Sequence, residues 1–218
     1  MDNIVSESLV VSPVKRKDGT YSLRLCINQG QLTVGMLKTV MDTMAKFNLT
    51  SLRATTGQRM NLEGIPEAKL SEVVASLGTA VEKAPPGLSV CSGAGVCLYG
   101  VQESRAVGDK VLALVKENGP YPFKVKSGVS GCKLACGLSF IRDIGLVGAP
   151  KGWDVYFGGA ATRNAGVGIQ LGKNVSEDEA LSMIGKALVY YRENGRKRER
   201  TSGTIKRLGA DALLAAVK

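Results

Sequence analysis

The chain has 218 residues, of which 44% are hydrophobic and 5% aromatic, and 29 lysines and arginines against 19 acidic residues give a formal net charge of +10. It contains no histidine, which excludes Ser-His-Asp hydrolases, Cys-His proteases, histidine-rich zinc enzymes, Rieske centres and histidine-ligated haem. The length suits one sizeable domain, or a domain with a smaller appendage. The charge predicts an anionic ligand or partner.

The first elements in the chain predict a small open-faced α/β sandwich within an α+β fold. Residues Tyr21–Asn28 alternate as in a strand, and an amphipathic helix should follow, with Thr33 as its N-cap. Leu52–Thr55 is expected to form a second strand. After a polar loop, Pro66 fits the first turn of a second helix that stops at Gly78.

A composition change at Ala84–Gly87, which contains two prolines, predicts a domain boundary and domains at residues 1–84 and 85–218. The second part should contain further helices and strands, and the sequence between Ser176 and Glu179 matches a capping box. The expected elements are a helix near Ser104–Glu117, a strand at Pro122–Val129, buried strands at Asp154–Gly158 and Val167–Leu171, a helix from the capping box to about Asn194, and a short C-terminal helix after the basic stretch Arg192–Arg207.

Four of the five cysteines form two spaced pairs in glycine-rich sequence. Cys91 and Cys97 have C-x5-C spacing, and Cys132 and Cys136 have C-x3-C spacing. Four thiolates brought together can hold a [4Fe–4S] cube, with one sulfur for each iron. A structural zinc site is the competing interpretation, although zinc modules usually use C-x2-C turns within a compact segment. Cys26, between Leu25 and Ile27, is expected to be a small buried apolar residue.

The paired cysteines and their surroundings resemble the siroheme and [4Fe–4S] nitrite and sulfite reductase family. The resemblance covers the sequence from about Ser22 to the end of the chain, and its length is similar to that of the small single-repeat sulfite reductases. It rests on the cysteine spacing and on four other segments: Leu52–Gly64, Val129–Gly148, Trp153–Gly159 and the C-terminal helices. The chain departs from the family pattern at Gly57, Lys133 and Leu134.

This resemblance implies a ferredoxin-like α/β sandwich half-domain followed by an α/β siroheme- and [4Fe–4S]-binding domain. It implies that all four paired cysteines bind the cluster and that Cys136 also bridges to the siroheme iron. The implied substrate- and cofactor-binding residues are Arg24, Arg53, Lys124 and Lys126, and Arg163 is a further candidate for a siroheme carboxylate. Siroheme carries eight carboxylates, so these cations would compensate buried negative charge.

The resulting hypothesis is a siroheme-dependent enzyme that reduces sulfite, or alternatively nitrite, with electrons from a low-potential ferredoxin-like donor. The basic run Arg196–Arg200 is a possible docking site for such an acidic donor, and more often such a run is a solvated helix end. Two alternatives remain, a siroheme-free [4Fe–4S] electron-transfer protein and a nucleic-acid-binding module. The second lacks a recognisable motif and an aromatic stacking platform, so no nucleic-acid partner is expected. With no signal peptide or membrane-spanning run evident, we expect a cytoplasmic protein with reduced thiols and no membrane partner.

Overall fold

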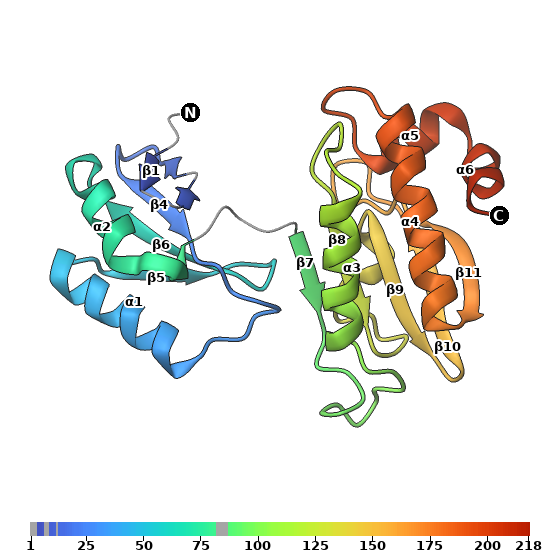
Figure 1. The fold of residues 1–218 in the computed structure, drawn as a ribbon, viewed down its shortest axis with the longest axis horizontal. Coiled ribbons are helices and arrows are strands. Elements are labelled where there is room, and N and C mark those ends of the chain that lie inside the picture. Colours follow the sequence, from blue (N-terminus) through green and yellow to red (C-terminus); the bar gives the residue numbers. More distant parts are fainter. Residues whose placement is uncertain (1–3, 7–8, 12, 82–86) are drawn as a thin grey trace. The chain divides into compact units, whose positions relative to one another are not determined.

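A computed structural model describes residues 4–6, 9–11, 13–81 and 87–218 of the chain. It divides into two compact units, Met1–Pro85 (unit 1) and Pro86–Lys218 (unit 2), each with a sheet and helices of its own (Figure 1). Of the predicted boundary Ala84–Gly87, only Gly87 lies within the described residues.

Unit 1 is built on a four-stranded antiparallel sheet with the strand order β3–β4–β6–β5. Two helices pack against one face of this sheet, where Leu23 and Leu62 of the strands meet Val40 and Val73 of the helices in a buried core. A separate hairpin joins β1 and β2. The elements are β1 (Ile4–Ser6), β2 (Leu9–Val11), β3 (Val14–Lys15), β4 (Tyr21–Arg24), α1 (Val34–Phe47), β5 (Ser51–Ala54), β6 (Met60–Ile65) and α2 (Leu70–Leu77).

The sequence predicted the helices of unit 1 better than its strands. Thr33 caps α1 as expected, because its hydroxyl accepts a hydrogen bond from the Met36 N–H at 3.2 Å, and α2 ends at the Gly78 cap. The expected polar loop before Pro66 is wrong in part, since it contains strand β6. Its polar residues alternate with apolar ones, which is the pattern of a strand with one open face.

Unit 2 contains a five-stranded mixed sheet with the order β11–β10–β9–β8–β7. Strands β7, β8 and β9 are parallel, whereas β10 pairs antiparallel with both β9 and β11. Helices α3 and α4 lie side by side over one face of the sheet (Figure 1). The elements are β7 (Gly87–Val90), α3 (Arg105–Glu117), β8 (Lys126–Ser130), β9 (Ile144–Ala149), β10 (Gly152–Phe157), β11 (Ile169–Val175), α4 (Glu177–Asn194), α5 (Thr201–Leu208) and α6 (Ala210–Val217).

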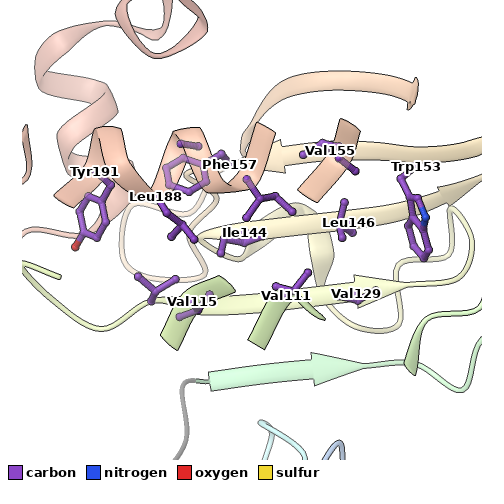
Figure 2. Close-up of a cluster of buried hydrophobic side chains, with 14 of the residues drawn as sticks. Val111, Val115, Val129, Ile144, Leu146, Trp153, Val155, Phe157, Leu188 and Tyr191 are labelled. Carbon is purple, nitrogen blue, oxygen red and sulfur yellow. The ribbon is translucent and has the colours of Figure 1, made fainter. Parts of the chain in front are cut away.

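The core of unit 2 lies between this sheet and the two helices (Figure 2). Val111 of α3 and Leu188 of α4 face Ile144 and Leu146 of β9, and all four are fully buried. Burying an aliphatic side chain of this size stabilises a fold by about 1.5–3 kcal/mol. The core therefore fixes the helix-covered face of the sheet and leaves the other face for different contacts.

Several predictions for unit 2 are confirmed, and others need correction. Ser176 and Glu179 form the expected capping box, and α4 ends at Asn194 as predicted. The sequence missed β7 and β9 and placed the start of β8 four residues too early. It also missed α5, which begins inside the basic stretch Arg192–Arg207 and is separated from the C-terminal helix α6 by Gly209. Strand β11 is not buried as expected, because it is the edge strand of the sheet. In the described part of the chain, no helix is both long and apolar enough to span a membrane.

Candidate cofactor and anion site

The face of the unit 2 sheet opposite α3 and α4 is lined by small residues. Ser89 of β7, Gly128 of β8 and Gly145 of β9 lie opposite one another in the strand register. Side chains alternate between the two faces of a strand, and the residues that follow these three, Val90, Val129 and Leu146, belong to the core under the helices. The small residues therefore form the opposite face.

Glycine on this face lets a cysteine-bearing loop lie directly against the sheet. A Cβ atom added at Gly128 would stand 2.6 Å from the Gly137 carbonyl oxygen, and one at Gly145 would stand 2.0 Å from the Ser139 carbonyl oxygen. Real Cβ contacts are essentially never shorter than 3.0 Å. The close approach therefore requires glycine at both positions, and it holds the loop after Cys136 on the sheet.

The two cysteine loops meet at Gly131. Its N–H donates to the Cys91 sulfur at 3.0 Å, and its carbonyl oxygen accepts from the Val101 and Gln102 N–H groups at 2.8 and 3.0 Å. Cys91 directly follows β7, whereas Cys132 directly follows Gly131. The end of the sheet thus brings the beginnings of both cysteine motifs together.

The four paired cysteines are free thiols, with Cys91, Cys97 and Cys132 half-buried and Cys136 exposed. This donor set fits a [4Fe–4S] cube, which takes one sulfur at each iron and receives N–H donors at its sulfurs, as Cys91 does from Gly131. Among the described residues, no three cysteine or acidic side chains are gathered in a way that could hold a single metal ion. Cys26 lies in unit 1, away from the paired cysteines in sequence, and its N–H donates to the Ala80 carbonyl at 2.9 Å.

Lys126 opens strand β8 on the same face as Gly128, and a buried carboxylate fixes its backbone. The Lys126 N–H donates to Asp143 Oδ2 at 2.8 Å. Asp143 is fully buried and also accepts hydrogen bonds from Arg200 Nε at 3.1 Å and from the Thr201 hydroxyl. A buried carboxylate with this many donors anchors the start of β8 and the start of α5 to one point.

Positive charge gathers around the Lys126 side chain. Burial lowers the pKa of Lys126, and Arg142, Arg200 and Lys124 lower this pKa further, whereas Asp143 opposes them. Nearby cations raise the free energy of the charged lysine, and an anion placed among them would lower it. The face therefore has the electrostatics of an anion-binding site.

The other two site candidates in unit 2 lie in connections. Lys124 is exposed, with its ammonium 5.2 Å from the centre of the Phe123 ring. Because β8 begins at Lys126, the expected strand alternation does not include Lys124. Arg163 is exposed in the connection between β10 and β11, where Ala160 and Gly166 close the loop with two backbone hydrogen bonds of 3.0 and 2.9 Å.

Arg24 and Arg53 lie together in unit 1, on the sheet face opposite its helices. Both pair in register with Asn61 of the central strand β6, and Arg24 Nε donates to Asn61 Oδ1 at 3.2 Å. Arg53 contacts Glu63 at 3.0 Å, and both arginines are exposed. The row Arg24–Asn61–Arg53 is thus a cationic strip on an open sheet face.

Sequence reasoning missed the role of Asp143 as a hydrogen-bonding centre and of Arg200 as its partner. Arg200 belongs to the basic run, and it makes an ion pair with Asp143. Glu199 in the same run contacts Arg207 at 2.7 Å, so the end of the run is part of the internal structure of unit 2. An acidic residue followed by an apolar segment with two glycines, as in Asp143–Gly148, was the available signal for a buried carboxylate.

Two family models match this chain. The nitrite/sulfite reductase ferredoxin-like half domain matches residues 14–80, and the nitrite and sulphite reductase 4Fe-4S domain matches residues 83–218. The first match falls in unit 1, and the second covers the described residues of unit 2 together with a few that precede it. The expected architecture, a ferredoxin-like half domain followed by a 4Fe-4S domain, is therefore confirmed.

Known proteins resemble the chain over most of its length. It is 34% identical to an assimilatory-type sulfite reductase of Nitratidesulfovibrio vulgaris, covering 94% of this chain and 95% of that protein. It is 35% identical to a nitrite reductase [NAD(P)H] of Bacillus subtilis, covering 89% of this chain but 24% of the relative.

A solved structure, that of the NirA protein of Mycobacterium tuberculosis, shares the fold with a TM-score of 0.79 at 22% identity. The alignment covers 97% of this chain and 42% of that one. On the two domain matches and the sulfite reductase relative, the chain belongs to the nitrite and sulfite reductase family of iron–sulfur oxidoreductases.

Proposed function

We propose that the protein reduces sulfite to sulfide with a [4Fe–4S] cluster and siroheme as its cofactors. The observation that carries this proposal is the shared face of the unit 2 sheet, where Lys126 and the loop that carries Cys132 and Cys136 lie on the same side. This arrangement supports a cluster and a cationic anion site within one unit. The relative of matching length, which bears the name assimilatory-type sulfite reductase, supports the choice of substrate.

When bound, siroheme and the cluster would supply an iron for the anion and a route for six electrons. Cys91, Cys97, Cys132 and Cys136 would ligate the cluster, with Cys136 shared with the siroheme iron. Arg24, Arg53 and Arg163 would donate hydrogen bonds to siroheme carboxylates or to the substrate. Such charge-assisted bonds are about twice as strong as neutral ones.

Lys126 and Lys124 would hold the sulfite oxygens and supply protons as S–O bonds break. Each departing oxygen must leave as water, so proton donors are needed beside the anion. The chain has no histidine, which leaves lysine ammonium groups as the natural donors. Burial and neighbouring cations lower the pKa of Lys126, and this makes its ammonium a stronger acid.

The proposal includes a low-potential, ferredoxin-like electron donor and a cytoplasmic location, because a cluster held by four cysteines needs reduced thiols. An acidic donor would match the net charge of +10 and the exposed residues Arg196, Lys197 and Arg198. It would be recognised mainly through electrostatic steering, so its association should weaken as salt increases.

A visible absorption spectrum and two rates test the proposal. The purified protein should show tetrapyrrole bands together with cluster absorption, and it should reduce sulfite with an artificial low-potential donor. The double variant Lys124→Ala plus Lys126→Ala should keep both chromophores and lose turnover. Full sulfite reduction by the double variant would remove the two lysines from the mechanism, and a colourless protein would rule out the cofactors.

Nitrite is the second candidate substrate, because the Bacillus subtilis relative bears the name nitrite reductase at 35% identity. Higher kcat/KM for nitrite than for sulfite would favour it. A siroheme-free electron-transfer protein is the third candidate. It would show cluster absorption without tetrapyrrole bands and would reduce neither anion.

A further inference from the structure

Arg142 lies on the same face as Lys126, but neither the motif nor the proposed mechanism gives it a role. It follows the second cysteine loop and immediately precedes the buried Asp143. Its side chain runs across strand β8 at Gly128, where an added Cβ would stand 3.0 Å from Arg142 Cγ. Beyond that strand its Nη2 donates to Ser89 Oγ of β7 at 3.2 Å. The guanidinium is therefore held over the small-residue face.

Arg142 is half-buried, and its Nε–H is buried without a hydrogen-bond acceptor among the residues that the structure describes. A buried donor without a partner destabilises the fold, and it does so more strongly when the group is charged. Folded proteins rarely leave such a donor unmet, so its presence indicates an acceptor supplied from outside the chain.

The charges around Arg142 specify the kind of acceptor. Lys126 and Arg200 are neighbouring cations. Burial is the main cause that lowers the pKa of Arg142, the charge of Arg200 lowers this pKa further, and the charge of Asp143 raises it. Asp143 already accepts hydrogen bonds from Arg200, Thr201 and the Lys126 backbone. The missing acceptor should therefore be an anionic oxygen, which a guanidinium binds with directed N–H groups.

We infer that Arg142 is a further binding residue of the site, and that its Nε–H donates to an anionic oxygen of a bound ligand. This inference rests on the proposed function, which supplies two anionic oxygens on this face: a siroheme carboxylate and an oxygen of sulfite. Both sources present the same chemistry to the guanidinium. The Ser89 hydroxyl holds Nη2 of the guanidinium in place, and Gly128 leaves room for the Arg142 side chain to cross β8.

The test compares Arg142→Gln with the wild-type protein and with Arg192→Gln, which removes one arginine charge at the exposed end of α4. Three quantities are measured on each purified protein: siroheme per chain, iron and acid-labile sulfide per chain, and the Kd for sulfite from the change in the visible spectrum. A charge-assisted hydrogen bond contributes about 1.5–3 kcal/mol, which corresponds to about 10- to 150-fold in affinity.

If the acceptor is a siroheme carboxylate, Arg142→Gln should bind siroheme about 10- to 150-fold more weakly. It should therefore be purified with less siroheme per chain, while its iron and sulfide content matches the wild type. If the acceptor is a sulfite oxygen, siroheme content stays the same and the Kd for sulfite rises by a similar factor. Arg192→Gln should match the wild type in all three measurements. Unchanged siroheme content and unchanged sulfite affinity in Arg142→Gln would overturn the inference.

A stability measurement separates binding from a structural role. In ligand-free protein, Arg142→Met should be at least as stable as the wild type, because it removes a desolvated charge with an unmet donor. A lower midpoint of thermal unfolding together with unchanged binding would make Arg142 structural and contradict the inference. If the wild-type protein binds no siroheme, the proposed function fails on its own. In that case, calorimetric titration of the siroheme-free proteins with sulfite tests the role of Arg142. The role is rejected if the wild type and Arg142→Gln bind sulfite equally well, or if neither protein binds it.

Discussion

The two units of this protein use glycine in opposite ways. In unit 1, Gly19, Gly35, Gly57, Gly64 and Gly78 all have open space where a Cβ would be. In unit 2, Gly128, Gly131, Gly137, Gly145 and Gly148 each have a backbone atom within 2.6 Å of that position. Close packing does not require these five glycines of unit 1, whereas these five glycines of unit 2 allow backbone segments to touch.

The charged groups also differ between the two units in how deeply they are buried. The arginine pair of unit 1, Arg24 and Arg53, is exposed on an open sheet face. In unit 2 the carboxylate of Asp143 is fully buried and accepts hydrogen bonds from the Arg200 side chain and the Lys126 backbone N–H. Close packing in unit 2 therefore fixes the geometry of a site, and unit 1 presents cations that a ligand could meet without rearranging the core.

Cysteine replacement should show the largest difference between the units. Cys91→Ser should remove the cluster, because Cys91 receives the Gly131 N–H and stands where the two cysteine loops meet. Changes in the surroundings of metal ligands already cost about 10–100-fold, so loss of a ligand should lower activity by more than about 100-fold. Iron content, acid-labile sulfide and visible absorption report the loss.

Cys26→Ser in unit 1 is the matched control, and it should keep full iron content. Equal iron loss in both variants would remove the distinction between the four paired cysteines and the fifth. Iron retained in Cys91→Ser would exclude Cys91 as a ligand.

Removal of a buried carboxylate should have the next largest effect. Asp143→Asn leaves Arg200 without its anionic partner, and breaking a buried pair in this way costs about 3–5 kcal/mol. Asp42→Asn breaks the exposed ion pair of Lys38 and Asp42 on helix α1 of unit 1, which should cost about 0.3–0.5 kcal/mol. Denaturant unfolding measures both, with the fluorescence of Trp153 reporting unit 2 and circular dichroism reporting the helices of both units, so that a transition seen only by circular dichroism belongs to unit 1. Similar losses in the two variants would contradict the contrast in burial.

Alanine at glycine positions tests the opposite uses of glycine directly. In Gly145→Ala the new Cβ meets the Ser139 carbonyl oxygen at 2.0 Å, and overpacking of this kind costs about 1–3 kcal/mol. Gly35→Ala in the first turn of α1 should instead stabilise unit 1, by less than the roughly 0.5–1 kcal/mol of a helix interior, because a helical alanine loses less entropy on folding than glycine.

Gly185→Ala on α4 sharpens this test, because Gly185 belongs to unit 2 but has open space at its Cβ position. It should also stabilise the fold by about 0.5–1 kcal/mol. Destabilisation by Gly185→Ala would mean that the cost of adding a methyl group depends on the unit and not on the small-residue face. Unfolding midpoints of the three variants are compared under identical conditions.

The sequence predicted best those features that depend on local contacts. The Thr33 cap and the Ser176–Glu179 capping box form between residues three apart, so their signals are complete within one turn. The spacing of the paired cysteines was likewise local, and together with the surrounding motifs it identified the family.

The features that the sequence could not predict depend on contacts between distant residues. Strand β6 alternates polar and apolar residues and becomes a strand through its two neighbours in the sheet. Asp143 becomes an anchor only because α5 brings Arg200 and Thr201 to it, 57 and 58 residues further along the chain. The orientation of Arg142 across β8 depends on Gly128 and Ser89. In each case the partner is chosen by tertiary packing, and the local pattern does not identify that partner.

The smallest expected effect is a pH dependence in the connection between α4 and α5. The hydrogen bond from Arg207 is the main cause that lowers the pKa of Glu199 from 4.5 to about 2. A carboxyl group whose pKa is lower in the folded state stabilises the fold above its unfolded pKa, and this contribution is lost as the pH falls through its folded pKa. Glu199→Gln should therefore be less stable than the wild type at neutral pH, and the difference should shrink below about pH 4.5 and vanish near pH 2.

Trp153 fluorescence during denaturant unfolding at a series of pH values measures this difference. Glu193→Gln is the control, because Glu193 lies on the exposed end of α4 and contacts Arg192 only at 3.8 Å. It should follow the wild-type curve at every pH. A difference between Glu199→Gln and the wild type that is independent of pH would mean that Glu199 acts through packing and not through its charge. The contrast between a fixed ion network in unit 2 and exposed cations in unit 1 would then rest on Asp143 alone.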